Sequence, residues 1–263
     1  MPLVYAALVP HTPLLLPSIG KEKRDEMLQT YGAIATIRQH IIDHAIDTLV
    51  ILAPHAPHKD PVFQLQHSTS YSASFEEFSD FTTQKSFRSD HILIDYLKHH
   101  FDEAKMPWVY HTDERMEYSA SVPLLALGIE SGMRIVVIYP PLSAHLPELA
   151  RTGIGLYDAL ASYPGRTAMI ASGDLSHTLS EEAPGGFHKD AKKFDQRIIK
   201  IFEKKEFGKL GTTSPEMIES VKICSMPSLA VLSGVLKNVS YTTHTLSYEA
   251  PLGVGHLVME YIL

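Results

Sequence analysis

Short apolar runs alternate along this chain with amphipathic segments of helical length, and this alternation limits the fold more than any other feature. The runs are nearly continuous in apolar, often β-branched residues, which is typical of strands buried on both faces of a sheet. They span residues 4–9, 48–53, 134–139 and 166–172. Segments 21–45 and 146–162 instead carry apolar residues at helical spacing. Strands that alternate with helices predict a sheet covered by helices on both faces.

We therefore predict an α/β fold in which residues 1–263 form a single three-layer α/β/α domain, phosphorylase/hydrolase-like, with a mixed, mostly parallel central sheet. Segments 241–248 and 254–261 read as strands separated by Pro251 and Gly253, so we expect these two strands to be antiparallel. Further strands are expected at 62–66 and 108–111, and further helices at 91–101, 122–130, 190–207 and in two pieces within 215–236.

Composition excludes several classes of protein. The 263 residues carry 23 Lys and Arg against 30 Asp and Glu, a net charge of −7 that lacks the basic footprint of a nucleic-acid binder. No stretch approaches the roughly 20 continuous apolar residues of a membrane span. The single cysteine, Cys224, excludes a disulfide framework and fits a reducing, cytoplasmic location. We interpret Cys224 as a small buried apolar residue.

Ionisable residues follow four of the predicted strands. His11 follows the first, His55 the second, Asp174 and His177 follow the run at 166–172, and Glu249 follows the Thr-rich strand near the C-terminus. Ligands of open α/β sheets bind beyond the carboxyl ends of the strands. If these strands are parallel and adjacent, the side chains converge at one edge of the sheet.

Two imidazoles and one carboxylate on one face of a metal are the ligand set of non-haem Fe(II) oxygenases. Zinc hydrolases use a similar set with water in the open position. The remaining histidine is then free for proton transfer. Taken singly, each residue also fits a simpler role: His11 and His55 as turn residues, Asp174 as a turn or helix cap, Glu249 as a solvated turn residue. The joint pattern is what favours a metal site.

At these positions the chain resembles a known family, the class III (LigB-type) extradiol ring-cleavage dioxygenase catalytic subunit. That family includes the domains called AmmeMemoRadiSam system protein B and, more distantly, the Memo proteins. The resemblance covers nearly the whole chain. It is carried by the motifs VPHTPLLLP at 9–17, ILAPHAP at 51–57, SGDLSH at 172–177 and SYEAPLGVG at 247–255.

The resemblance implies that His11, His55 and Glu249 are metal ligands, that His177 is the acid–base catalyst, and that Asp174 orients it. A carboxylate rather than a cysteine at position 249 favours the dioxygenase branch over the Memo branch. The implied cofactor is Fe(II), with zinc as the alternative occupant.

The resemblance also bears on the substrate. Tyr118 stands where the family often carries a histidine, just before the Val-Pro-Leu helix start. A tyrosine can donate a hydrogen bond there, but it does not take up a proton near neutral pH. We expect Tyr118 and His58 to contact the substrate.

The leading hypothesis is Fe(II)-dependent extradiol cleavage of a small, catechol-like aromatic substrate with O₂. The alternatives are a catalytically silent, Memo-like metal-binding or interaction protein, and a zinc-dependent hydrolase at the same site. Family members often form homodimers, sometimes with a small accessory subunit, so a homodimer is expected here.

Overall fold

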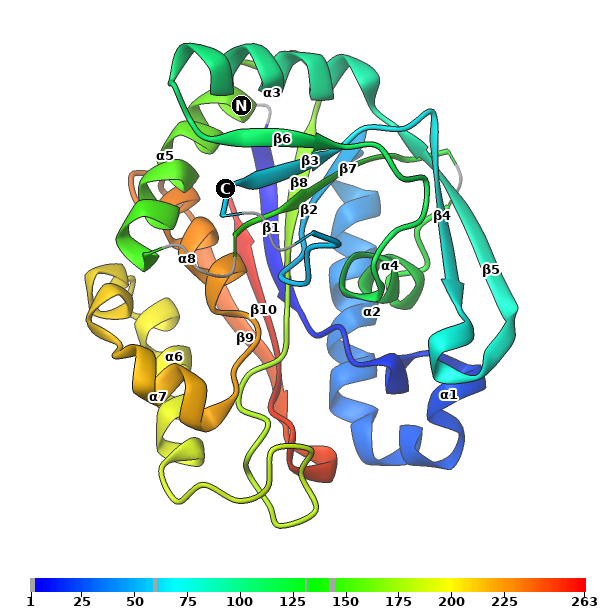
Figure 1. Cartoon of the computed structure of the whole chain (residues 1–263), viewed down its shortest axis with the longest axis vertical. Coiled ribbons are helices and arrows are strands. Elements are labelled where there is room, and N and C mark those ends of the chain that lie inside the picture. The colour runs from blue at the N-terminus through cyan, green and yellow to red at the C-terminus, as the bar shows by residue number, and fades with distance from the viewer. Residues whose placement is uncertain (1–2, 59–60, 131, 142–144) are drawn as a thin grey trace.

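A computed structural model describes residues 3–58, 61–130, 132–141 and 145–263. Within them, ten strands form one sheet (Figure 1). The strands are β1 (Leu3–Val9), β2 (Thr48–Leu52), β3 (Phe63–Gln66), β4 (Ser70–Phe75), β5 (Asp80–Ser89), β6 (Trp108–His111), β7 (Arg134–Tyr139), β8 (Thr167–Ser172), β9 (Thr242–Glu249) and β10 (His256–Ile262). The α-helices are α1 (Pro17–Gly20), α2 (Leu28–Asp43), α3 (His91–Glu103), α4 (Tyr118–Ala126), α5 (Leu146–Ser162), α6 (Ala191–Glu203), α7 (Pro215–Val221) and α8 (Met226–Val235). Short 3₁₀ helices are η1 (Pro13–Leu15), η2 (Lys21–Met27), η3 (Glu76–Phe78), η4 (Phe207–Thr212) and η5 (Pro251–Gly253).

The sheet is mixed and mostly parallel, as predicted. Its order is β4-β5-β7-β2-β8-β1-β10-β9, with β3 pairing with both β7 and β6. Strands β5, β7, β2, β8 and β1 all run in the same direction. The last two strands form the expected antiparallel pair, and β10 is also antiparallel to β1. The parallel centre places the carboxyl ends of β2, β8 and β1 side by side.

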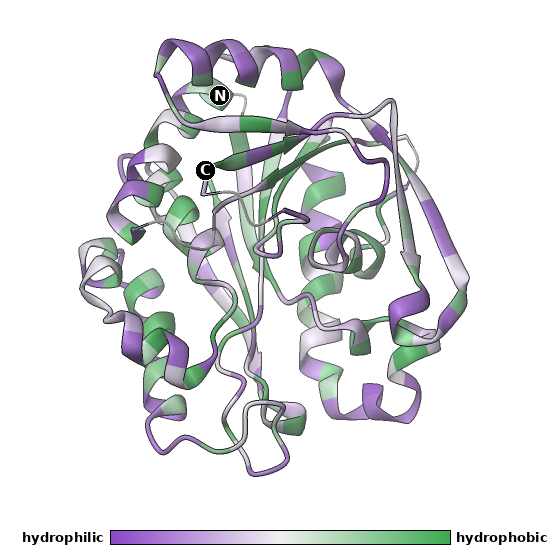
Figure 2. Ribbon diagram, viewed as in Figure 1, coloured by the Kyte–Doolittle hydropathy of each residue, from purple (hydrophilic) through white to green (hydrophobic). Residues whose placement is uncertain are grey.

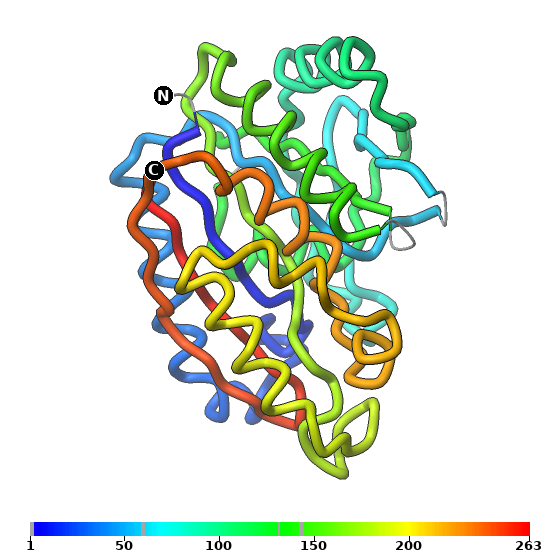
Figure 3. The backbone as a smooth tube through the Cα atoms, turned by 90° about the vertical axis from the view of Figure 1, so that its left-hand side faces the viewer, coloured from blue at the N-terminus to red at the C-terminus, as the bar shows by residue number. Residues whose placement is uncertain are grey.

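Helices cover both faces of the sheet, which confirms the three-layer α/β/α fold. Helices α3, α5, α6 and α8 pack on one face, and α2 and α4 pack on the other, each set with its own apolar core. Figure 3 shows α5, α6 and α8 in front of the strands. In Figure 2 the central strands are largely hydrophobic, whereas hydrophilic residues are prominent along α3.

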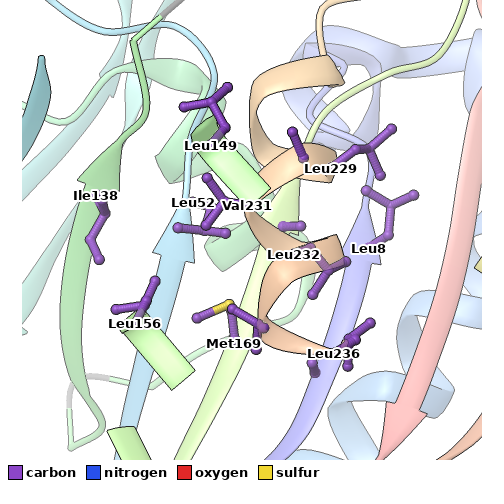
Figure 4. Close-up of a cluster of buried hydrophobic side chains, with 14 of the residues drawn as sticks. Leu8, Leu52, Ile138, Leu149, Leu156, Met169, Leu229, Val231, Leu232 and Leu236 are labelled. Atoms are coloured by element: carbon purple, nitrogen blue, oxygen red, sulfur yellow. The ribbon is translucent and has the colours of Figure 1, made fainter. Parts of the chain in front are cut away.

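Helix α8 forms the centre of one apolar core, and all ten of its residues are buried. Figure 4 shows its Leu232 near Leu8 of β1 and Met169 of β8, and its Val231 beside Leu52 of β2, all in the same cluster. A fully buried side chain of this size contributes about 1.5–3 kcal/mol through removal of apolar surface from water. The core therefore fixes α8 against the same three strands whose carboxyl ends meet at one edge.

Several elements depart from the sequence prediction. The segment predicted as a helix over 21–45 begins as η2, and α2 begins only at Leu28. Helix α4 begins at Tyr118, four residues before the predicted start, and includes Pro123. The β4–β5 hairpin was not predicted, because its strands carry mainly Ser, Thr, Gln and Lys and lack a long apolar run.

In the part of the chain that the structure describes, no helix has the length and apolar character needed to cross a membrane.

Replacing Leu232 with Ala tests the contribution of α8 to the core. We expect Leu232→Ala to lower the free energy of unfolding by about 2–5 kcal/mol, because it leaves a cavity in the core between α8 and the sheet. Urea denaturation measures the change. Ile42→Ala on α2 is the control: its side chain is 58% exposed, so its effect should stay within about 0.5 kcal/mol. Equal effects of the two variants would contradict this assignment of the core.

Candidate metal centre

The structure brings four of the predicted site residues to one edge of the sheet. His11 follows β1, His55 follows β2, and Asp174 and His177 follow β8, the strand between β1 and β2. The ring centroids of His11 and His55 lie 5.0 Å apart. Both His11 and Asp174 are buried, whereas His55 and His177 are partly exposed. These side chains thus form a cluster that opens toward the surface on one side.

A hydrogen-bond chain that starts at a proline sets the tautomer of His11. Pro123 has no N–H, so within α4 the carbonyl of Ser119 lacks its usual helical donor. That carbonyl accepts a hydrogen bond from the Ser172 hydroxyl instead. Since this hydroxyl proton is engaged, Ser172 Oγ accepts the proton of His11 Nδ1, 3.2 Å away. His11 Nε2 is therefore unprotonated and free to bind a metal.

The lone pair of His11 Nε2 faces a residue that the sequence analysis interpreted only as apolar. Cys224 Sγ lies 3.4 Å from it, and Cys224 sits in the short connection between α7 and α8. Donor atoms of His11, His55 and Cys224 all lie within 4.8 Å of one another. Asp174, His177 and Cys224 form a second group by the same measure. The structure thus corrects the interpretation of Cys224, which joins both groups.

The charges of the cluster favour a bound cation. Burial lowers the pKa of His11 to about 4, although the nearby Asp174 carboxylate opposes the shift. Burial by itself would raise the pKa of Asp174, but the imidazoles of His11 and His256 outweigh it and hold that pKa below its usual range. Asp174 Oδ1 accepts from the His11 amide and contacts His256 Nδ1, each at 3.2 Å. Near neutral pH the cluster therefore combines a neutral imidazole with a buried carboxylate.

The cysteine completes this electrostatic arrangement. Burial, and then the charge of Asp174, raise the pKa of the Cys224 thiol well above its usual range. The thiol donates to the Asp174 carbonyl oxygen, 3.5 Å away, and its sulfur also contacts His11 Nε2 at 3.4 Å. A metal that binds here would displace that proton and neutralise the thiolate.

Tyr118 lies against the cluster. Its ring stacks on His55, with centroids 5.3 Å apart, and meets the edge of the His11 ring at 5.4 Å. Burial raises the pKa of the Tyr118 hydroxyl, so it stays protonated and can donate a hydrogen bond. Tyr118 is thus adjacent to the place predicted for the substrate.

His58 is not brought to the cluster. It is exposed, and its ring packs against His111, with centroids 5.2 Å apart.

Glu249 also lies away from the two imidazoles, which corrects the placement expected from the sequence. Its carboxylate binds the N-terminus of α2: it accepts from the Gln29 amide at 2.8 Å, the Thr30 amide at 3.2 Å and the Thr30 hydroxyl at 2.9 Å. The reason is topological. Strand β10 lies between β1 and β9, so β9 ends two strand spacings, about 10 Å, from β1. A helix N-terminus offers a carboxylate free amide donors and a favourable dipole.

The fold and the cluster define an α/β protein with a candidate metal centre at the carboxyl edge of its parallel strands. Comparison with known families identifies the class: the model described as the catalytic LigB subunit of aromatic ring-opening dioxygenase matches residues 5–259, and the chain belongs to this family. Proteins of this family depend on metals.

Two individual proteins are similar to this chain. Protein CA_C1420 of Clostridium acetobutylicum is 26% identical over 264 residues, a match that covers 96% of this chain and 56% of that protein. The chain thus spans about half the length of this curated relative. The crystal structure of uncharacterized protein JW3007 from Escherichia coli K12 superimposes with a TM-score of 0.66 at 14% identity, covering 98% of this chain and 99% of that one. This likeness shows a shared fold.

Replacing Ser172 with Ala tests the hydrogen-bond chain. We expect Ser172→Ala to weaken zinc binding by about 10- to 100-fold, because nothing then holds the proton on His11 Nδ1. Titration against a competing chelator measures the affinity, and ¹⁵N NMR of the imidazoles reports the tautomer. Ser228→Ala is the matched control, since Ser228 is also buried and donates to a carbonyl, that of Leu52. Unchanged affinity in Ser172→Ala would refute the role of this serine.

Replacing Glu249 with Ala distinguishes its role at the N-terminus of α2 from the predicted role as a metal ligand. We expect Glu249→Ala to lower the free energy of unfolding by about 0.5–2 kcal/mol, the usual effect of losing a helix N-terminal cap. The zinc affinity of Glu249→Ala should stay within about twofold of the wild-type value, a margin equal to the scatter of such titrations. Thr242→Ala, an exposed change on the same strand, controls for effects on β9. A loss of metal with unchanged stability would restore Glu249 as a ligand.

Proposed function

We propose that the protein is a metal-dependent ring-opening dioxygenase that acts on a small, catechol-like aromatic substrate with O₂ at a centre held by His11, His55 and Cys224. The observation that carries the proposal is the grouping of donor atoms: His11 Nε2 lies 3.4 Å from Cys224 Sγ, and the donor atoms of His11, His55 and Cys224 lie within 4.8 Å of one another. Family membership supplies the reaction class.

The donor set fits the proposed metal. Imidazole and thiolate bind iron, copper and zinc, whereas magnesium and calcium prefer oxygen ligands. One thiolate supplies the single negative charge that a carboxylate supplies in the two-histidine iron sites of oxygenases. We propose Fe(II), held by His11, His55 and Cys224 in place of the set that includes Glu249. The chemistry it supplies when bound is Lewis acidity toward the phenolic oxygens of the substrate together with electron exchange with O₂.

His177 is the proposed acid–base group. Its Nδ1 is buried and has no hydrogen-bond partner among the described residues. It can accept the second phenolic proton of the substrate and return a proton to the product as the ring opens. The Asp174 carboxylate, within 4.8 Å of a ring nitrogen of His177, stabilises the imidazolium that forms between the two transfers. The backbone of His177 is held by its amide bond to the Val221 carbonyl.

Tyr118 and Asp174 complete the site in this proposal. The Tyr118 ring stacks on His55 and meets the His11 ring edge-to-face, which holds both imidazoles in place, and its protonated hydroxyl can donate to a substrate oxygen. The buried Asp174 fixes the loop after β8 through the His11 amide and His256. We place the reaction in the cytoplasm, since a reducing compartment keeps Cys224 as a thiol.

Two other functions have a specific observation in their favour. A zinc-dependent hydrolase is favoured by the thiolate among the donors, because catalytic zinc sites combine cysteine and histidine and keep one position for water. A catalytically silent metal-binding or interaction protein is favoured by Tyr118, whose ring packs against His55 and His11 at a position where the family often carries a histidine.

One experiment separates these three functions. The protein is purified without oxygen, its metal content is measured, and O₂ uptake is followed with a panel of catechols. Bound iron with catechol-dependent O₂ uptake supports the proposal. Zinc with hydrolysis supports the hydrolase, and metal without turnover supports the silent protein. His11→Ala and Cys224→Ser should both lose the metal.

Replacing His177 with Ala tests the acid–base assignment. We expect His177→Ala to retain the metal and to lose turnover by about 10²- to 10⁴-fold, the usual contribution of a positioned proton-transfer group. Metal analysis and O₂ uptake are measured on the same sample. His188→Ala, a change in the same loop outside the cluster, should leave both unchanged. Catechol cleavage at the wild-type rate in His177→Ala would remove this residue from the mechanism.

A further inference from the structure

A cavity of about 490 Å³ adjoins the candidate metal centre, and Cys224 belongs to the wall of the cavity as well as to the cluster. Its walls come from the start of α5, the end of η4, α7 and the start of α8. The lining is mainly apolar and includes Leu146, Leu149, Ile218, Ile223 and Met226. A volume of this size and an apolar lining are typical of sites for small organic molecules.

One polar group in this lining lacks a partner. Thr213 is 6% exposed, and its Oγ1 forms no hydrogen bond within the described residues. The Thr213 amide donates a hydrogen bond to the Leu210 carbonyl, so it is the side-chain hydroxyl of Thr213 that lacks a partner among the described residues. A buried hydroxyl without a partner is unfavourable, and a ligand that offers a hydrogen-bonding atom removes that penalty.

The charges around the cavity indicate which ligands it rejects. Among the described lining residues Glu219 is the acidic one, none is Lys or Arg, and His145 is the one basic side chain; Glu219 and His145 are both exposed. A neighbouring cavity of about 340 Å³ shares Leu146, Pro147 and Gly211 with it but also carries Arg151 and Lys237. A carboxylate in the first cavity would lose its water against a mainly apolar wall with no Lys or Arg among the described lining residues to pair with, which is unfavourable.

We infer that this cavity holds the substituent of the aromatic substrate, and that this substituent is uncharged, largely apolar and carries one hydrogen-bonding atom for Thr213. The inference rests on the proposed function and narrows its substrate class: neutral alkyl-substituted phenolic rings are accepted and carboxylated rings are not. The ring itself points toward Cys224 and the two imidazoles.

Two phenols with side chains of equal length test this inference. The probes are 4-(3-hydroxypropyl)phenol and 3-(4-hydroxyphenyl)propanoate, each with a single phenolic oxygen, so neither can chelate a metal. Binding is measured by calorimetry with the protein as purified and again after treatment with a chelator. We expect the alcohol to bind at least tenfold more tightly than the carboxylate in both preparations. Equal affinity, or preference for the carboxylate, would overturn the inference.

Two variants locate the binding. Ile218→Trp fills the cavity and should abolish binding of the alcohol, whereas Ile154→Trp, which fills the neighbouring cavity, should leave it intact. Thr213→Val should weaken binding of the alcohol by about three- to tenfold, the usual effect of one lost hydrogen bond. The affinity for 4-propylphenol, which has no such hydroxyl, should stay unchanged. Thermal unfolding checks that each variant folds. Undiminished binding to folded Ile218→Trp, or a Thr213→Val effect that is equal for both phenols, would contradict the assignment.

Cys224 provides a readout that needs no turnover, since it is the single cysteine of the chain. Alkylation by N-ethylmaleimide, followed by mass spectrometry of the chelator-treated protein, should slow when the alcohol is bound and in Ile218→Trp, but not in Ile154→Trp. A rate unaffected by both the ligand and Ile218→Trp would show that the cavity does not lead to Cys224, and would overturn the inference.

These results are separable from those on the proposed function. Absence of catechol-dependent O₂ uptake, with the phenol preference and the variant effects intact, rejects the oxygenase and leaves the cavity as a ligand site. Catechol-dependent O₂ uptake in a protein that binds neither phenol rejects the cavity assignment alone.

Discussion

A missing amide proton in α4 determines how the candidate metal centre is built. Because Pro123 cannot donate, the Ser119 carbonyl is available to the Ser172 hydroxyl, and that hydroxyl in turn accepts from His11 Nδ1. The unprotonated face of His11 is thereby directed at Cys224. A proline inside a helix usually only weakens it, whereas here the freed carbonyl of α4 is linked through Ser172 of β8 to His11, at the carboxyl end of β1. The helix thus holds His11, a proposed ligand, in position through Ser172.

The balance of charge at this edge explains why the cluster suits a cation. Desolvation disfavours a protonated His11, and the buried Asp174 remains ionised only because imidazoles and the His11 amide surround it. Burial disfavours the charged form of Cys224 as well, so the thiol keeps its proton, just as the His11 imidazole loses one. Neutral nitrogen, thiol and carboxylate are therefore held close together, and a divalent cation that displaces the thiol proton relieves the unfavourable burial of the negative charge.

The sequence predicts the parts of this site that depend on parallel, adjacent strands. His11, His55, Asp174 and His177 follow buried apolar runs, and the carboxyl ends of such strands meet at one edge. Glu249 also follows a strand, but a local sequence pattern does not determine which strands pair. In the structure β10 lies between β9 and β1, so the end of β9 is separated from the cluster. Cys224 follows no strand; it reaches the site because α8, buried along its whole length, must begin where the strands end. The β4–β5 hairpin escaped prediction because partly exposed edge strands lack a strong apolar pattern.

Helix α8 connects the stability of the fold to the shape of the proposed substrate cavity. Gly153 of α5 and Gly234 of α8 let the two backbones touch: a Cβ on Gly153 would lie 2.0 Å from the Val231 carbonyl oxygen, and one on Gly234 would lie 1.8 Å from that of Ala150. The cavity begins one to two turns away, between the first turns of the same helices. Close contact at the glycines fixes the angle between α5 and α8, and their N-terminal turns, which carry the larger side chains Leu149 and Met226, are thereby held apart. The core that secures α8 on the sheet therefore also sets the width of the space beside Cys224.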